Sequence, residues 1–142
     1  MIKKHGSAKW SGGLKDGKGQ VSTETGVLSE QPYGFKNRFE GVKGTNPEEL
    51  IGAAHAACYA MAMSIGFEDN GSKATSIDVK STVSLEPDGD GFSITKIHLD
   101  VKASAPDIDA ATFQKIAEDT KVGCPVSKLL KAAEITMEAK LV

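Results

Sequence analysis

Residues 45–58 read TNPEELIGAAHAAC, and this stretch predicts the central element of the fold. Asn46 suits the N-cap of a helix, Pro47 suits the first helical position, and Glu49 stands where a capping box places its acid. Helical spacing continues to the sequence DNG at 69–71, where a glycine favours a helix end. The stretch therefore predicts a long helix. It also raises the question of why a helix suited to packing carries an acid, a histidine and a thiol.

The apolar residues of this helix recur three or four positions apart, which predicts one buried stripe along it. The residues of this stripe are Leu50, Ala54, Ala57, Met61 and Ile65, with Ile51 and Cys58 beside them. Many of the remaining positions hold Ala, Gly or Ser, which let another element approach closely. His55 interrupts the apolar run 50–67, so we expect a packed helix here rather than a membrane span.

The length and composition of the chain narrow the possibilities further. The chain has 142 residues, the length of one ordinary domain, so we expect a single domain over 1–142. Its 39% hydrophobic and 25% charged residues are typical of soluble globular proteins, and a net charge of −2 favours neither nucleic acid nor an anionic membrane as a partner. No apolar segment follows the basic residues of MIKKHGSAKW, so we expect no secretory signal and a cytoplasmic protein.

Shorter elements flank the long helix on both sides. Before it, we expect a hairpin of residues 6–12 and 17–24, an irregular segment at 25–35, and a short strand at 37–41 that carries Arg38. After it, we expect strands at 76–87 and 92–104, a helix at 110–123 capped by Asp109, a helix at 124–132 with Pro125 at its first position, and a strand at 134–142. This order predicts an α+β domain rather than a series of βαβ units.

The chain has two cysteines, Cys58 and Cys124, and their context argues against a structural disulfide or a metal site. Thiols in the cytosol are normally kept reduced. The two cysteines lie 66 residues apart, with no C-x-x-C spacing and no nearby pair of histidines. We therefore ask which of the two thiols has surroundings that would make it reactive.

A thiol reacts as its thiolate, so a reactive cysteine needs a group that lowers its pKa. Cys124 precedes Pro125 and stands at the predicted N-cap of a helix, where free N–H groups favour a negative sulfur. Cys58 lies more than two turns inside its helix and would need a cation from elsewhere. His55 and Arg38 are the candidates. Arg38 is the better one because it is always charged, and Glu48 is placed to hold its planar group.

The residues alone leave other interpretations open. A cysteine in an apolar helix also serves as a small core residue, and His55 also serves as a packed histidine. Glu48 alone reads as a first-turn acid that complements the helix dipole, and Arg38 alone reads as a surface charge. Tyr33 and Phe35, which precede Arg38, suit either a pocket lining or a loop anchor.

Two stretches that contain the cysteines resemble a known family. The sequences NPEELIGAAHAAC (46–58) and GCPVSKLLKAAEITMEAKL (123–141) are similar to those of the osmotically induced protein C and organic hydroperoxide resistance family of thiol peroxidases. Residues 22–58 resemble the osmotically induced protein C (OsmC) branch in particular. The resemblance covers nearly the whole chain. It implies two central helices wrapped by antiparallel β-sheets in an intertwined homodimer with active sites at the subunit interface.

The resemblance also implies a role for each candidate residue. Cys58 matches the peroxidatic cysteine and Cys124 the resolving cysteine. Arg38 matches the arginine that stabilises the thiolate and orients the peroxide, and Glu48 matches the glutamate that holds this arginine. The implied activity is thiol-dependent reduction of organic hydroperoxides, and of hydrogen peroxide, through a Cys58 sulfenic acid and a Cys58–Cys124 disulfide.

The implied peroxidase would need no metal, haem, flavin or other cofactor, because sulfur itself carries the oxidation. Its implied partners are the hydroperoxide, a dithiol reductant such as a small thiol or a lipoyl or thioredoxin-type donor, and a second copy of the chain. Its implied role is defence against oxidative and osmotic stress. Two alternatives remain: a thiol redox sensor or ligand-binding stress protein without turnover, and a structural protein whose cysteines only pack.

Overall fold

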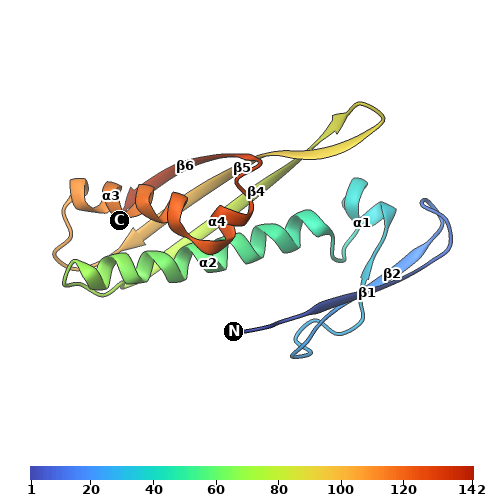
Figure 1. Cartoon of the computed structure of the whole chain (residues 1–142), viewed down its shortest axis with the longest axis horizontal. Coiled ribbons are helices and arrows are strands. Elements are labelled where there is room, and N and C mark those ends of the chain that lie inside the picture. The colour runs from blue at the N-terminus through green and yellow to red at the C-terminus, as the bar shows by residue number, and fades with distance from the viewer. The chain divides into compact units, whose positions relative to one another are not determined.

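The structure is a computed structural model that describes residues 1–142, and it consists of two compact units. The first unit is Met1–Leu50 and the second is Ile51–Val142 (Figure 1). The boundary falls within the long helix. Each unit has its own sheet, so each is described by itself.

The first unit is built on a three-stranded antiparallel sheet with the order β1-β2-β3. Its strands are β1 (Gly6–Ser11), β2 (Lys18–Thr23) and β3 (Gln31–Tyr33). The predicted N-terminal hairpin is confirmed. Two glycines of this hairpin make room for aromatic rings, because a Cβ at Gly17 or Gly19 would lie within 2.5 Å of Trp10 or Tyr33 ring atoms.

Two predictions for the first unit are wrong. Residues 31–33 form the strand β3 within a segment expected to be irregular, and residues 37–41 do not form a strand. Instead, Arg38 lies on the short helix α1 (Phe35–Phe39), whose first turn closes with a bond of 3.1 Å from the Arg38 N–H to the Gly34 carbonyl. Phe35 and Phe39 are four positions apart, so their rings meet on one side of this helix, with centroids 4.9 Å apart.

The long helix is α2 (Pro47–Asp69), close to its predicted bounds. The Glu49 N–H donates to Asn46 Oδ1 at 2.8 Å, which confirms Asn46 as the capping residue. The second unit continues with β4 (Ser76–Asp88), β5 (Gly91–Ser104), α3 (Ala110–Gly123), α4 (Pro125–Leu129) and β6 (Glu134–Leu141). All five elements were predicted, although α4 ends three residues before its expected end.

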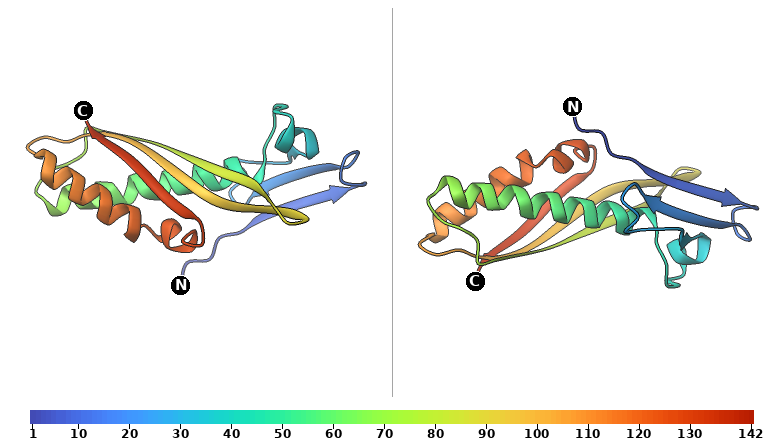
Figure 2. Two further views of the ribbon diagram at one scale, coloured as in Figure 1. Left: turned by 90° about the horizontal axis from the view of Figure 1, so that it is seen from above. Right: turned by 90° about the horizontal axis from the view of Figure 1, so that it is seen from below.

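The sheet of the second unit has the order β4-β5-β6, and one of its faces packs against α2 and α3 (Figure 2). The core residues from the three elements follow the period of each element. They are Tyr59, Met63 and Phe67 on α2, Leu99, Val101 and Ala103 on β5, and Phe113, Ile116 and Ala117 on α3. Cys124 belongs to the same core.

The second sheet is mixed, which corrects the expectation of antiparallel sheets. β4 and β5 pair antiparallel, but β6 pairs parallel to β5, from Lys96 with Glu134 to Ala103 with Leu141. A parallel neighbour requires a crossover, and the segment α3–α4 provides it. The fold class remains α+β, because α2 and the β4–β5 hairpin stand outside this single crossover.

A β-bulge explains an irregularity in the apolar pattern of β5. The strand buries Ile97, Leu99, Val101 and Ala103, yet the preceding apolar residue, Ile94, is out of phase with them. The register of β4 with β5 shifts between Ser84 and Leu85, so that Thr95 is the extra residue. The bulge therefore switches which residues of β5 face the helices.

The predicted buried face of α2 is wrong. The buried residues of this helix are Gly52, His55, Tyr59, Met63 and Phe67. Met61 and Ile65 of the predicted stripe are 73% and 58% exposed. Apolar residues occupy most of the circumference of α2, so periodicity alone cannot select its packed face. By length and composition, α2 is also the one helix suited to span a membrane. One face of this helix packs against the sheet and includes the buried polar side chain of His55.

Candidate active site

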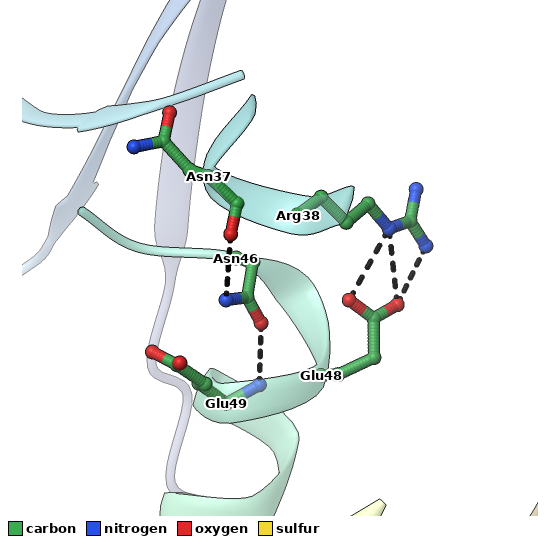
Figure 3. A network of polar contacts seen from close by, with 5 residues as sticks. All are labelled: Asn37, Arg38, Asn46, Glu48 and Glu49. Atoms are coloured by element: carbon green, nitrogen blue, oxygen red, sulfur yellow. Dashed lines mark hydrogen bonds and ion pairs between the residues drawn. The ribbon is translucent and has the colours of Figure 1, made fainter. Parts of the chain in front are cut away.

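In the first unit, Arg38 and Glu48 form a closely matched ion pair (Figure 3). Arg38 Nη2 donates to Glu48 Oε1 at 2.6 Å, and Arg38 Nε lies 3.1 and 3.2 Å from the two carboxylate oxygens. The Glu48 side chain is 13% exposed and that of Arg38 is 36% exposed. The carboxylate therefore holds one edge of the guanidinium, and the other edge remains available to a substrate.

The cap of α2 helps to place both partners of this pair. Asn46 accepts from the Glu49 N–H with its oxygen, and its side-chain nitrogen donates to the Asn37 carbonyl at 3.4 Å (Figure 3). One side chain thus joins α1, which carries Arg38, to the first turn of α2, which carries Glu48. This link is a tertiary contact that the capping pattern in the sequence did not reveal.

An apolar pocket of about 240 Å³ lies beside Arg38 in the first unit. Its wall includes the side chains of Trp10, Leu14, Tyr33, Phe35 and Phe39. The guanidinium carbon of Arg38 lies 5.6 Å from the centre of the Phe39 ring. The pocket combines an apolar wall with one cation, an arrangement suited to a molecule that has an organic body and a polar oxygen end.

In the second unit, the two cysteines are free thiols that lie near each other. Cys58 is half-buried on α2, whereas Cys124 is 1% exposed and stands at the N-cap of α4, as predicted. Each thiol influences the ionisation of the other. Two sulfurs that are remote in sequence but close in space are suited to form a disulfide.

The pKa values of the two thiols shift in opposite directions within this unit. Burial raises the pKa of the Cys58 thiol; the Val126 N–H opposes this effect and the Cys124 thiol adds to it. Burial also acts to raise the pKa of Cys124, but the Ser127 N–H, the Cys58 thiol and the Ser127 hydroxyl together lower it below its ordinary value. Cys58 therefore needs a cation from outside the thiol pair before it ionises readily.

His55 lies fully buried one helical turn before Cys58, and both of its ring nitrogens have hydroxyl partners. Nε2 lies 2.8 Å from Ser127 Oγ on α4, and Nδ1 lies 3.2 Å from Ser81 Oγ on β4. Burial lowers the pKa of His55, so the neutral imidazole is favoured. Sequence reasoning named His55 but missed both serines. Ser127 lies within the CPVS motif, whereas no signal in the sequence marks Ser81.

The structure thus forms two clusters from the residues predicted in the sequence. Arg38 and Glu48 meet in the first unit, and Cys58 and Cys124 meet in the second. Tyr33 and Phe35, for which the sequence left a pocket lining or a loop anchor open, both line the pocket beside Arg38. No group of three or more His, Cys, Asp or Glu side chains is arranged to hold a metal ion.

Comparisons with known proteins identify the family of this chain. A family model described as "OsmC-like protein" matches residues 40–140. The chain is 57% identical over 140 residues to peroxiredoxin OsmC of Escherichia coli strain K12, a match that covers 99% of this chain and 97% of that protein. The crystal structure of the organic hydroperoxide resistance protein OhrB of Bacillus subtilis is 25% identical, with a TM-score of 0.71 and coverage of 96% and 98%. An OsmC-like protein from Mycoplasma pneumoniae shares the fold at 15% identity, with a TM-score of 0.75 and coverage of 99% and 98%. The chain therefore belongs to the OsmC-like protein family.

Proposed function

We propose that this protein is a thiol-dependent peroxidase that reduces organic hydroperoxides to alcohols and hydrogen peroxide to water. The observation that carries the proposal is the proximity of Cys58 and Cys124 in a chain that is 57% identical to a protein named peroxiredoxin OsmC. A pair of free thiols supplies the two electrons that reduction of one peroxide requires.

In the first step, the Cys58 thiolate attacks one oxygen of the hydroperoxide. A sulfur–oxygen bond forms and the oxygen–oxygen bond breaks, so that an alkoxide leaves and takes up a proton as an alcohol. Cys58 becomes a sulfenic acid. The Cys124 sulfur then attacks the Cys58 sulfur, a disulfide forms, and the hydroxyl leaves as water. A dithiol donor finally exchanges with the disulfide and restores both thiols.

We propose that Arg38 is the cation that Cys58 requires. Its charge would offset the effect of burial on the Cys58 pKa, and its free edge would donate to the peroxide oxygens, including the oxygen that gains charge as it leaves. Glu48 would keep the guanidinium in one orientation, as the bidentate pairing of Nε with Oε2 and of Nη2 with Oε1 suggests. The apolar pocket beside Arg38 would accommodate the organic part of the substrate, which favours organic hydroperoxides over hydrogen peroxide.

We further propose that residues 1–142 act as one domain in a homodimer. The exposed apolar side chains on α2, Met61 and Ile65 among them, form a surface of the kind that pairs with another protein surface. We expect a cytoplasmic enzyme of oxidative and osmotic stress defence that uses a small thiol or a lipoyl or thioredoxin-type donor. Light scattering of the wild type and of Met61→Glu tests the dimer, because a buried charge at this position would favour monomers.

Turnover of cumene hydroperoxide with dithiothreitol tests the proposed activity. Cys58→Ser is expected to abolish turnover. Cys124→Ser is expected to permit one oxidation, which leaves a sulfenic acid on Cys58 that a dimedone label detects. In the wild type, mass spectrometry after one equivalent of hydroperoxide should identify a Cys58–Cys124 crosslink. Equal turnover in the wild type and Cys58→Ser would refute the proposal, and stoichiometric oxidation without turnover under any dithiol would indicate a sensor.

A further inference from the structure

The hydrogen-bonded group around His55 connects a buried thiol to a half-buried strand. Ser127 Oγ lies 2.8 Å from His55 Nε2, and its hydroxyl also acts on the Cys124 sulfur three residues earlier in the chain. On the other side of the ring, Nδ1 lies 3.2 Å from the oxygen of Ser81, a residue that is partly accessible to solvent. Cys124, Ser127 and His55 are all at most 2% exposed, so the Cys124 thiol has very little contact with water.

We propose that Ser127, His55 and Ser81 form a proton relay for Cys124, in which His55 is a positioning residue that orients the Ser127 hydroxyl toward the sulfur. The proposal rests on the peroxidase function proposed above, because it assigns the relay to the step in which Cys124 attacks the oxidised Cys58. The relay makes the buried sulfur a nucleophile without a permanent charge near it.

The relay has two arrangements, one for each state of the sulfur. When Cys124 is a thiol, its S–H donates to Ser127 Oγ, the Ser127 hydroxyl donates to Nε2, and the Nδ1–H donates to Ser81 Oγ. When Cys124 is a thiolate, all three bonds reverse direction. The Ser81 hydroxyl then donates to Nδ1, the Nε2–H donates to Ser127 Oγ, and the Ser127 hydroxyl donates to the sulfur. His55 is neutral in both arrangements and changes only its tautomer.

The change from thiol to thiolate conserves protons. The sulfur gives a proton to Ser127, Ser127 gives one to Nε2, Nδ1 gives one to Ser81, and Ser81 releases one to water. The thiolate then forms the disulfide bond with Cys58 as the sulfur–oxygen bond of the sulfenic acid breaks. The departing hydroxide combines with the released proton, so the sum is one sulfenic acid and one thiol giving one disulfide and one water.

Four other ionisable groups lie near the Cys124 end of the relay. Cys58 and Tyr59 on α2 interact electrostatically with Cys124. Asp69 on α2 and Asp119 on α3 line a cavity that also reaches Cys124. Burial raises the pKa of Tyr59, so this phenol stays neutral. Cys58 and the Ser127 hydroxyl both act on the Cys124 sulfur, and of these two only the serine connects it to His55.

Quenched-flow mass spectrometry separates the relay from the first chemical step. Reduced protein is mixed with one equivalent of tert-butyl hydroperoxide between about pH 6 and pH 9, and the fractions of thiol, sulfenic acid and disulfide are followed in time. Ser127→Ala and His55→Phe are expected to form the sulfenic acid within about twofold of the wild-type rate and to slow its condensation by about a hundredfold. Ser127→Thr, which keeps the hydroxyl, is expected to restore most of the condensation rate.

The pH profile distinguishes a relay from a merely structural role. Below the thiol pKa, the condensation rate of Ser127→Ala is expected to rise about tenfold per pH unit and to level off at a higher pH than in the wild type. The relay would be overturned if Ser127→Ala and His55→Phe both showed the same condensation rate and the same pH profile as the wild type. If circular dichroism shows that His55→Phe does not fold, Ser127→Ala and Ser81→Ala decide the question.

A matched control and the wild type itself separate the two proposals. His98 is a histidine on β5 whose Nδ1 lies 2.7 Å from Thr136 Oγ1, away from the thiols, and His98→Gln is expected to leave both rates unchanged. Failure of the wild type to form any sulfenic acid on Cys58 would overturn the proposed function. Normal sulfenic acid formation with undisturbed condensation in the serine variants would overturn the relay alone.

Discussion

Gly52 and Gly66 on α2 differ in the atoms that an added methyl group would contact, and from this difference we predict how each Gly→Ala substitution changes the free energy of unfolding. A Cβ at Gly52 would lie 2.8 Å from the Ser81 carbonyl oxygen of β4. A Cβ at Gly66 would lie 2.6 Å from Cγ2 of Ile116 on α3, beside a cavity of about 300 Å³ that Ile116 also lines. Gly52 therefore faces backbone, and Gly66 faces a side chain with space next to it.

The expected free energies follow from this contrast. Replacing a helical glycine with alanine favours the helix by about 1 kcal/mol at either position. At Gly52 the carbonyl belongs to a strand paired with β5, so the helix itself must move outward, and such overpacking costs about 1–3 kcal/mol. At Gly66 the Ile116 side chain can shift toward the cavity at a smaller cost. We therefore expect Gly52→Ala to lose about 1 kcal/mol and Gly66→Ala to change by less than about 0.5 kcal/mol.

Urea unfolding of the reduced proteins at one fixed protein concentration measures both free energies. Far-UV circular dichroism before the titration checks that each variant keeps its helix content. The reasoning is refuted if Gly52→Ala is as stable as Gly66→Ala or more stable, because the backbone contact at Ser81 would then not limit the approach of α2 to the sheet.

Further predictions concern the buried histidine, the core and the ion pair. Burial lowers the pKa of His55, so below about pH 6.5 the unfolded chain binds a proton that the folded chain does not. The free energy of unfolding should therefore fall by up to about 1.4 kcal/mol per pH unit below this value. Urea titrations should show a smaller fall with pH in His55→Gln. Phe113→Ala should lose about 3–5 kcal/mol in the same assay, because Phe113 is fully buried and stacks on a second ring, whereas Val122→Ala, at a 69% exposed position of α3, should change by less than about 0.5 kcal/mol. Arg38→Lys should lower kcat/KM for cumene hydroperoxide at least about tenfold, because an ammonium cannot keep a bidentate contact with Glu48 while it donates to the peroxide; an unchanged kcat/KM would contradict this role.

Local patterns in the sequence predicted most of the elements. The caps at Asn46 and Asp109 join residues three positions apart, and the alternation of apolar and polar residues in β4 and β5 is a pattern within each strand. These interactions are visible in the sequence because the chain brings the partners together by itself. The prediction of a strand at residues 37–41 was wrong because a segment of five residues is too short for its apolar pattern to distinguish a strand from a helix such as α1.

Local patterns in the sequence did not predict how the side chains of the candidate site contact one another. The sequence contained Cys58, Cys124, Arg38 and Glu48, and the family resemblance assigned them roles, but no local pattern indicates that Ser81 or Ser127 contacts His55. These contacts join residues that lie 26 and 72 positions apart. Only the packing of α2 against β4 and α4 brings their hydroxyl groups to the two ring nitrogens.

By itself, therefore, the sequence determined most of the helices and strands, the caps at Asn46 and Asp109, and the presence of two thiols, because these depend on residue identity and on patterns within a few residues. The tertiary structure decided which face of α2 is buried, the parallel pairing of β6 with β5, and the proximity of the two thiols. An apolar helix surface can pack in more than one direction, and only the shapes of the surrounding elements select one.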